Sequence, residues 1–294
     1  ENRSIRAQKL DLAPAQKLRL VDFLLEEIQP ENRDYLYDYY ENNCSTRIRD
    51  AIDFALGGIV EDELGAAAAS QTWRDHTRRL TAEDFWLYLG LEIGLGAPVD
   101  RPISQWDEMF IPAELANSMA SVEFSGGGLV RPLVQEDVML YESSLRNPPA
   151  VPMSWWPRYL LASLGLVLLV GRLDRVAIRG LARALSRSWL LLAGMVGLSL
   201  LFFWFGTDHS VASLNLNLLV FNPLWFIGVA WRGHDKIPLL AVGIFSLIAL
   251  AFVFLPPGQY TLDVLAAFLP LNLAAAAGIR LSRIPPADQP GAPA

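Results

Sequence analysis

The sequence predicts an α+β extracytoplasmic domain followed by an all-α bundle of five transmembrane helices. The chain has 294 residues, of which 52% are apolar and 19% charged, and its mean hydropathy is +0.28. This composition argues against a disordered chain or a wholly soluble single domain. Residues 1–150 carry 14 Lys and Arg against 26 Asp and Glu, whereas residues 151–294 carry 10 against 5. The two parts therefore belong in different environments.

The basic part contains five apolar runs of spanning length, joined by short polar connectors. They cover residues 155–173, 189–205, 214–231, 237–255 and 262–279. The third run is the most polar, because it contains Asn215, Asn217, Asn222 and Pro223. A broken or re-entrant third segment therefore stays open.

The basic residues predict the orientation of the bundle. Nine of them lie in the connectors and the tail on one side: Arg172, Arg175, Arg179, Arg183, Arg187, Arg232, Lys236, Arg280 and Arg283. The opposite connectors, residues 206–213 and 256–261, contain no Lys or Arg. The positive-inside rule then places the C-terminus in the cytoplasm and the acidic part outside it. We predict an outer domain over residues 1–150, membrane helices over 151–283 and a disordered cytoplasmic tail over 284–294.

The start of the chain lacks what this topology requires. Residues 1–30 have neither the basic start nor the apolar core of a signal peptide, and the first residue is Glu1. We therefore expect either residues upstream of Glu1 or a processed N-terminus.

Three elements are predicted around the single cysteine. Residues 10–28 form an amphipathic helix with an apolar side, and the aromatic residues 35–40 indicate a short strand. A second helix follows, capped by Asn42 or Asn43 and closed by Gly57 and Gly58. Cys44 therefore lies in the first turn of a helix that follows a strand.

Cys44 is suited to nucleophilic chemistry, because the N-terminus of a helix stabilises a thiolate and offers N–H groups to a developing oxyanion. With one cysteine in the sequence, no internal disulfide can form. The alternative interpretation, with about equal weight, is a small buried apolar residue.

Three stretches carry a resemblance to a known family. They are YLYDYYENNCSTRIRD, GLGAPVDRP and WDEMFIP, and five apolar runs follow them. This pattern resembles the bacterial family with an Lnb-type periplasmic domain and a five-helix membrane domain. The resemblance implies a permuted papain-type thiol fold, similar to NlpC-like hydrolases, and a lipoprotein N-acyltransferase in the inner membrane. It also implies a phospholipid as acyl donor and a lipoprotein as acceptor.

Carried onto this sequence, the resemblance makes Cys44 the catalytic nucleophile. Its neighbours Asn43, Ser45 and Thr46 would shape the turn or the oxyanion pocket. Arg47, Arg49 and Asp50 match the rest of the motif, although such charges are more often surface groups or a local ion pair. The family's histidine precedes the cysteine, and no residue upstream of Cys44 is a histidine. Either the missing part lies upstream of Glu1, or the protein is an inactive remnant.

Two other groups of polar residues are weaker candidates. His76 could replace the upstream base, although its segment is typical of a solvated helix face. Asp208, His209, Asn215 and Asn217 lie at the predicted outer end of the bundle and could bind a lipid head group, although a simple interfacial loop is at least as plausible.

The sequence leaves three function classes open. The first is a thiol acyltransferase of the envelope, the second an NlpC-like cysteine peptidase or amidase, and the third a non-catalytic membrane module. We expect no cofactor and no metal site, because the chain has one cysteine and no histidine pair at helical spacing. The net charge of −12 over residues 1–150 argues against nucleic acid as a partner.

Overall fold

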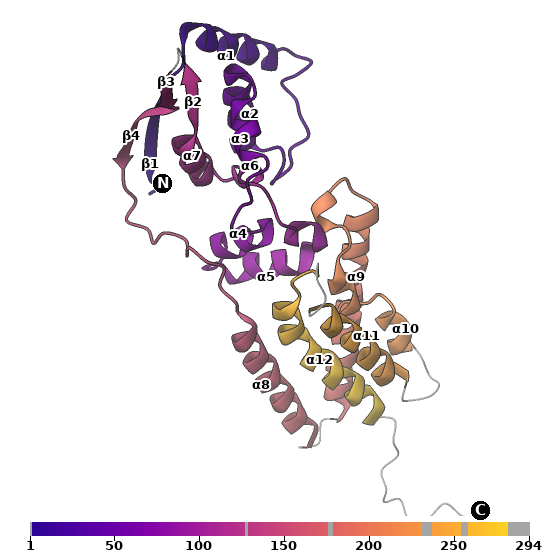
Figure 1. Cartoon of the computed structure of the whole chain (residues 1–294). Helices are drawn as coiled ribbons and strands as arrows, with labels where there is room; N and C mark the ends of the chain where they lie inside the picture. The colour runs from indigo at the N-terminus through magenta and orange to yellow at the C-terminus, as the bar shows by residue number, and fades with distance from the viewer. Residues whose placement is uncertain (1, 127–128, 176–178, 231–236, 254–257, 282–294) are drawn as a thin grey trace, which may run out of the picture. The chain divides into compact units, whose positions relative to one another are not determined.

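A computed structural model describes residues 2–126, 129–175, 179–230, 237–253 and 258–281 (Figure 1). The chain forms two compact units. Unit 1 contains Glu1–His76 and Pro102–Pro149, and unit 2 contains Thr77–Arg101 and Ala150–Ala294. Residues 77–101 thus belong with the predicted membrane helices, although the boundary expected at residue 150 groups them with the outer domain. The predicted tail, 284–294, lies outside the described residues.

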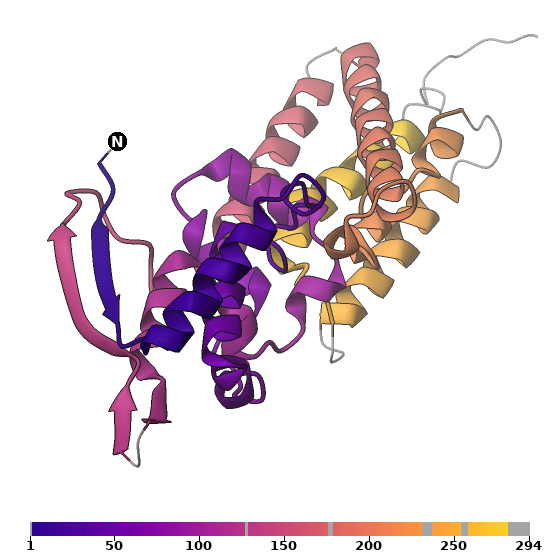
Figure 2. The same cartoon turned by 90° about the horizontal axis from the view of Figure 1, so that it is seen from above.

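Unit 1 contains two small antiparallel sheets. β1 (Ile5–Leu10) pairs with β4 (Val134–Tyr141), with Ile5 opposite Tyr141 and Leu10 opposite Val134. β2 (Glu123–Gly126) pairs with β3 (Leu129–Pro132). Figure 2 shows β1 beside β4 at the edge of the unit. This pairing joins the start of unit 1 to its end.

The pairing of β1 with β4 is expected to weaken at low pH. Arg6 Nε donates to Asp137 Oδ1 at 2.7 Å, and Gln8 also donates to this carboxylate. These hydrogen bonds lower the pKa of Asp137 to about 2. Because the pKa is lowered in the folded protein, the ionised carboxylate stabilises the pair above about pH 4, and this contribution is lost as the pH falls through 2. The protection of the β1 amides against exchange, measured from pH 4 to 1.5 relative to the intrinsic exchange rate at each pH, should fall in the wild type, and Asp137→Asn should show lower protection already at pH 4.

The helices of unit 1 pack around an apolar core. They are α1 (Pro14–Glu27), α2 (Cys44–Leu56), α3 (Ile59–Leu64), the short α6 (Gln105–Glu108) and α7 (Pro112–Ser121). The core combines Leu56 of α2, Val60 of α3, Met119 of α7 and Met109 with Leu133 from the chain between elements. Both predicted helices are confirmed. However, α1 has no buried residue, and Phe23 packs on Phe54 of α2 with ring centroids 5.1 Å apart.

The strand predicted over residues 35–40 is wrong. Asp38 and Asn42 instead form an isolated antiparallel bridge, and the side chain of Asp38 accepts hydrogen bonds from the N–H groups of Tyr40 and Glu41. An Asp side chain that bonds the backbone two residues on favours a tight turn over an extended strand. Cys44 therefore follows a turn.

Unit 2 contains α5 (Phe85–Gly94) and the helices of the basic part. α8 (Trp156–Arg175), α9 (Arg179–Phe205), α11 (Ile237–Val253) and α12 (Leu262–Leu281) correspond to four of the predicted spans. Among the described helices, one stretch, Ala184–Phe205 of α9, is both long and apolar enough to cross a membrane by itself. The core lies between α9 and α12 and includes Leu190, Val264 and Ala276. The count of five spans stays a prediction.

The third apolar run is broken. It contains a 3-10 turn, η3 (Leu216–Leu219), and a short helix, α10 (Trp225–Ala230), separated by the segment with Pro223. The polar residues of this run serve the end of α5. Asn215 Nδ2 donates to the carbonyls of Ile93 and Gly94 at 2.9 and 3.0 Å, and Asn217 Nδ2 donates to those of Glu92 and Ile93 at 2.8 and 3.0 Å. The last carbonyls of a helix lack partners within it, and these amides supply them.

A buried charged cluster around Arg78 joins α5 and α12 within unit 2. Arg78 Nε donates to Tyr88 Oη at 3.0 Å, and its guanidinium lies 3.7 Å from Asp263 and 4.0 Å from Glu92. Tyr88 Oη donates to Asp263 Oδ2 at 2.5 Å. The guanidinium also covers the ring of Tyr260, 4.0 Å from its centroid. Burial raises the pKa of Tyr260 to about 12, so this hydroxyl stays protonated.

Candidate active site

Cys44 is the first residue of α2, and its thiol is free and exposed. The exposure excludes the interpretation as a small buried residue. The helix begins here because Asn43 has an extended backbone and its side chain accepts the first free N–H groups. The helix ends at Gly57, which has φ +82° and adopts the left-handed conformation that glycine tolerates best.

Asn43 holds the start of α2 in place through its whole side chain. Its Oδ1 accepts from the N–H groups of Ser45 and Thr46 at 2.7 and 3.0 Å. Its Nδ2 donates to the carbonyls of Tyr39 and Phe110 at 2.8 and 2.9 Å. All of these bonds are internal, so Asn43 positions the cysteine and has no free donor for a substrate.

The backbone N–H of Cys44 is the donor that the first turn leaves available. The N–H groups of Ser45 and Thr46 bind Asn43, whereas that of Cys44 has no hydrogen bond to the described residues. Ser45 Oγ donates to the carbonyl of Met109 at 2.8 Å, and Thr46 Oγ1 accepts from the N–H of Asn43 at 2.8 Å. The thiol and an open N–H on one residue can bind a carbonyl carbon and its oxygen.

The surface beside Cys44 is apolar and aromatic. Ile48 lies one helical turn after Cys44 on the same face and is 54% exposed. Partial burial, followed by the electrostatic interaction with Cys44, raises the pKa of Tyr37. The phenol therefore stays protonated and able to donate a hydrogen bond near the thiol. Leu36 and Tyr39 beside it are also exposed. The sequence did not indicate a role for Tyr37, because the strand predicted there does not show toward which residue its hydroxyl would point.

The three charged residues of the motif have structural partners. Arg47 lies 3.3 Å from Glu27 and covers the ring of Tyr35. Arg49 binds Asp50 at 2.7 Å, donates to the carbonyl of Trp106 and covers its ring at 3.9 Å. The local ion pair that was the alternative for Arg49 and Asp50 is therefore present, and these contacts fix α2 against its neighbours.

His76 belongs to α4 (Trp73–Leu80) and is buried, with 1% of its surface exposed. The prediction of a solvated helix face is wrong here, because Trp73 and Arg74 are buried as well. His76 Nε2 lies 2.7 Å from Glu108 Oε1, and its ring packs edge-on against Phe110. Among the described residues, no hydrogen bond joins His76 to Cys44.

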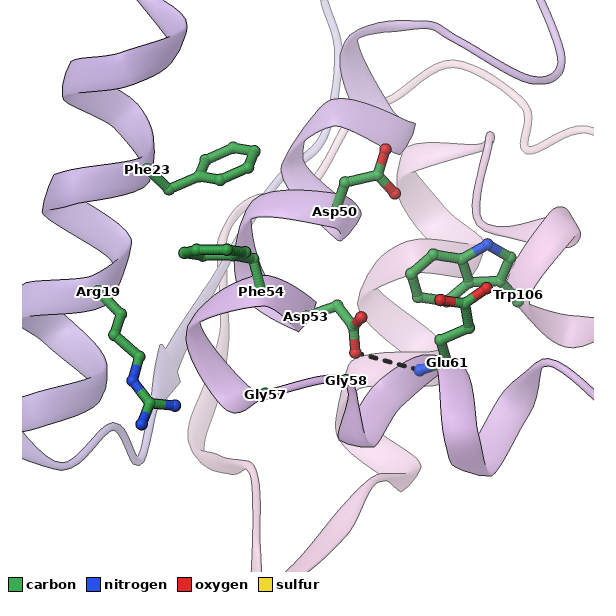
Figure 3. Close-up of a pocket in the computed structure, with 9 residues that line it drawn as sticks. All are labelled: Arg19, Phe23, Asp50, Asp53, Phe54, Gly57, Gly58, Glu61 and Trp106. Carbon is green, nitrogen blue, oxygen red and sulfur yellow. Dashed lines mark hydrogen bonds between the residues drawn. The ribbon is translucent and has the colours of Figure 1, made fainter.

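A groove of about 580 Å³ lies farther along α2. Figure 3 shows Phe23 and Phe54 on one side and Trp106 on the other, with Asp50 and Asp53 between them. Asp53 Oδ1 accepts from the N–H groups at the start of α3 at 2.8 and 3.1 Å, so it serves as a helix cap. Cys44 does not line this groove, since residues six and nine positions later on a helix lie on other faces.

The predicted head-group residues divide into two pairs within unit 2. Asp208 and His209 are exposed, and His209 Nδ1 lies 3.1 Å from Thr207 Oγ1. Asn215 and Asn217 are buried, and their amides cap α5. A head-group site thus stays a prediction that depends on Asp208 and His209. Among the residues described, no cluster of three His, Cys, Asp or Glu could hold a metal ion.

Asn43→Ala is expected to destabilise unit 1 by about 2 kcal/mol, because it removes a helix cap and leaves the carbonyl of Phe110 without its donor. The measurement is the free energy of unfolding in the membrane-extracted protein. Asn147→Ala is the matched control, since Asn147 is exposed, and its change should stay within about 0.5 kcal/mol. Equal effects of the two variants would contradict the role given to Asn43.

An exposed thiol at a helix start in one unit and a set of apolar helices in the other define a membrane protein with a thiol-bearing domain. Comparisons with known families agree. Residues 1–79 match the Lnb N-terminal periplasmic domain, and residues 152–282 match the Lnb transmembrane domain. The chain therefore belongs to the Lnb family, as a membrane protein with a periplasmic N-terminal part. No curated protein and no solved structure matched the chain.

Proposed function

We propose that this protein is a membrane-bound thiol acyltransferase of the bacterial envelope. It would move a fatty acyl chain from a phospholipid to the N-terminal amine of a lipoprotein, with Cys44 as the nucleophile. The observation that carries this proposal is the exposed thiol at the start of α2 with its own N–H open. The family match supports the substrate class, and the apolar surface at Leu36 and Ile48 suits an acyl chain.

The reaction has two balanced halves. The Cys44 thiolate attacks the ester carbonyl of the phospholipid, and the Cys44 N–H stabilises the oxyanion. The C–O bond breaks, the lysophospholipid alcohol takes a proton, and a thioester forms. The lipoprotein amine then attacks the thioester, the C–S bond breaks, and an amide and the free thiol result. The resemblance assigns the base of both halves to a histidine that precedes the cysteine in the family.

The test is the detection of the thioester. The complete gene product, extracted from cells, should carry a fatty acyl group on the peptide that contains Cys44, and hydroxylamine should release it. Cys44→Ser should carry no hydroxylamine-sensitive group, whereas Ser45→Ala should keep it. A wild-type protein without any acyl group on Cys44, in cells that modify lipoproteins, would contradict the proposal.

The test also separates the other function classes. A peptidase or amidase uses water as the acceptor and would release free product from cell-wall peptides without lipid. A non-catalytic module would show neither a thioester nor a phenotype when Cys44 is replaced. The exposed apolar surface beside Cys44 favours the acyltransferase over both. We further propose that the protein spans the inner membrane with its C-terminus in the cytoplasm, since the basic connectors lie on that side.

A further inference from the structure

An apolar groove of about 240 Å³ lies between three helices of unit 2. Its walls include Leu166 and Val170 of α8, Leu185 and Trp189 of α9, and Leu271 and Ala274 of α12. α8 and α12 pack along each other, and α9 packs against both (Figure 1). A cavity of roughly 150 Å³ with aliphatic walls is sufficient to bind benzene. The groove is therefore large enough for a length of acyl chain.

The walls of the groove are held in place by polar contacts behind them. Trp189 Nε1 donates to Asn272 Oδ1 at 2.8 Å, and Asn272 Nδ2 donates to the carbonyl of Val220 at 2.9 Å. The ring of Trp189 stacks on Phe268, with centroids 5.9 Å apart. Because the indole of Trp189 is held at its N–H by Asn272 and at its ring face by Phe268, it cannot readily rotate into the groove. The space is therefore a preformed site.

The surroundings identify the occupant. All of the lining residues lie within residues 152–282, which match the transmembrane domain. The solvent around a transmembrane domain is lipid, and an apolar groove that opens to lipid admits hydrocarbon more readily than water. The groove lies toward the end of α8 and the start of α9.

The charge at this end of the helices indicates the class of lipid. Residues 171–187 contain five arginines and one aspartate, a net charge of +4. Arg172 lies two residues after Val170, and Arg187 two residues before Trp189, and both arginines are exposed. Basic residues between membrane helices recognise the phosphate of anionic lipids. We propose that this groove binds one acyl chain of an anionic phospholipid, whose head group Arg172 and Arg187 hold.

Lipid binding to the full-length protein in detergent tests the proposal. The probes are phosphatidylglycerol and phosphatidylcholine with identical acyl chains, and native mass spectrometry measures the dissociation constants. Wild type should bind phosphatidylglycerol more tightly than phosphatidylcholine. Ala274→Phe fills the groove and should weaken both lipids by about tenfold, the equivalent of about two lost methylene groups. Val170→Phe, from the α8 wall, should do the same if Ala274→Phe fails to fold.

Matched variants separate the groove from the membrane surface in general. Ala162→Phe adds the same ring to an exposed position of α8 and should leave both affinities unchanged. Arg172→Gln with Arg187→Gln should abolish the preference for phosphatidylglycerol, whereas Arg158→Gln, near the other end of α8, should keep it. Full affinity in both groove variants, or equal affinity of wild type for the two lipids, would overturn the proposal. Cys44 does not line this groove and the measurement is lipid binding rather than acyl transfer, so failure here is distinct from failure of the acyltransferase proposal.

Discussion

Cys44→Ala is expected to lower acyl transfer by at least about 1,000-fold, because no other group in the proposed reaction can hold the acyl chain between donor and acceptor. The free energy of unfolding should change by no more than about 0.5 kcal/mol, since the thiol is exposed. The measurement is transfer of a labelled acyl chain from phospholipid to a lipoprotein acceptor by the full-length protein in detergent or vesicles.

Two variants make this result specific to the thiol. Ser45→Ala removes a neighbouring hydroxyl that donates to the carbonyl of Met109, and it should keep most of the activity. Tyr37→Phe removes the hydroxyl near the thiol and should lower the rate by a smaller factor than Cys44→Ala. Activity in Cys44→Ala within tenfold of wild type would reject Cys44 as the nucleophile.

The elements around Cys44 could be predicted where the signal was local. The Asn cap, the apolar period of α2 and the glycine pair at its end each act within a few residues, and all three are present in the structure. The strand at residues 35–40 could not be excluded in this way, because aromatic alternation is shared by strands and by exposed turns. The side chain of Asp38 decided between them by bonding the backbone of the turn.

The partners of the polar residues could not be predicted, because they come from distant parts of the chain. The arginines beside His76 indicated a solvent-exposed position for it, yet His76 lies in the interior of unit 1, where it binds Glu108. Asn217 lies in a stretch whose polar residues are typical of an interfacial loop, yet its side chain caps a helix that ends more than 120 residues earlier. Helical periodicity indicates which side of a helix is apolar, but it does not indicate which element covers that side.

The second large effect is expected on the stability of unit 2, when the buried cluster around Arg78 is disrupted. Arg78→Met is expected to destabilise unit 2 by about 3 kcal/mol or more, because it leaves the carboxylates of Glu92 and Asp263 without the guanidinium near both. Both carboxylates are almost completely buried, at 1% and 0% exposure. Removal of one partner from a buried ion pair costs much more than the loss of an exposed pair. Denaturation of the full-length protein in mixed micelles measures the change.

A double-mutant cycle separates charge from packing. Asp263→Asn removes one negative charge but keeps the size of the side chain, so Arg78→Met should cost about 1–3 kcal/mol less in that background. Arg158→Met is the control for the loss of an arginine in this unit, because Arg158 is exposed and contacts the ring of Trp155. Its effect should stay within about 0.5 kcal/mol. Equally small losses of stability in Arg78→Met and Arg158→Met would show that the cluster does not hold residues 77–101 against α12. The apolar contacts of Tyr88 with Tyr159 and Ala266 would then have to do so.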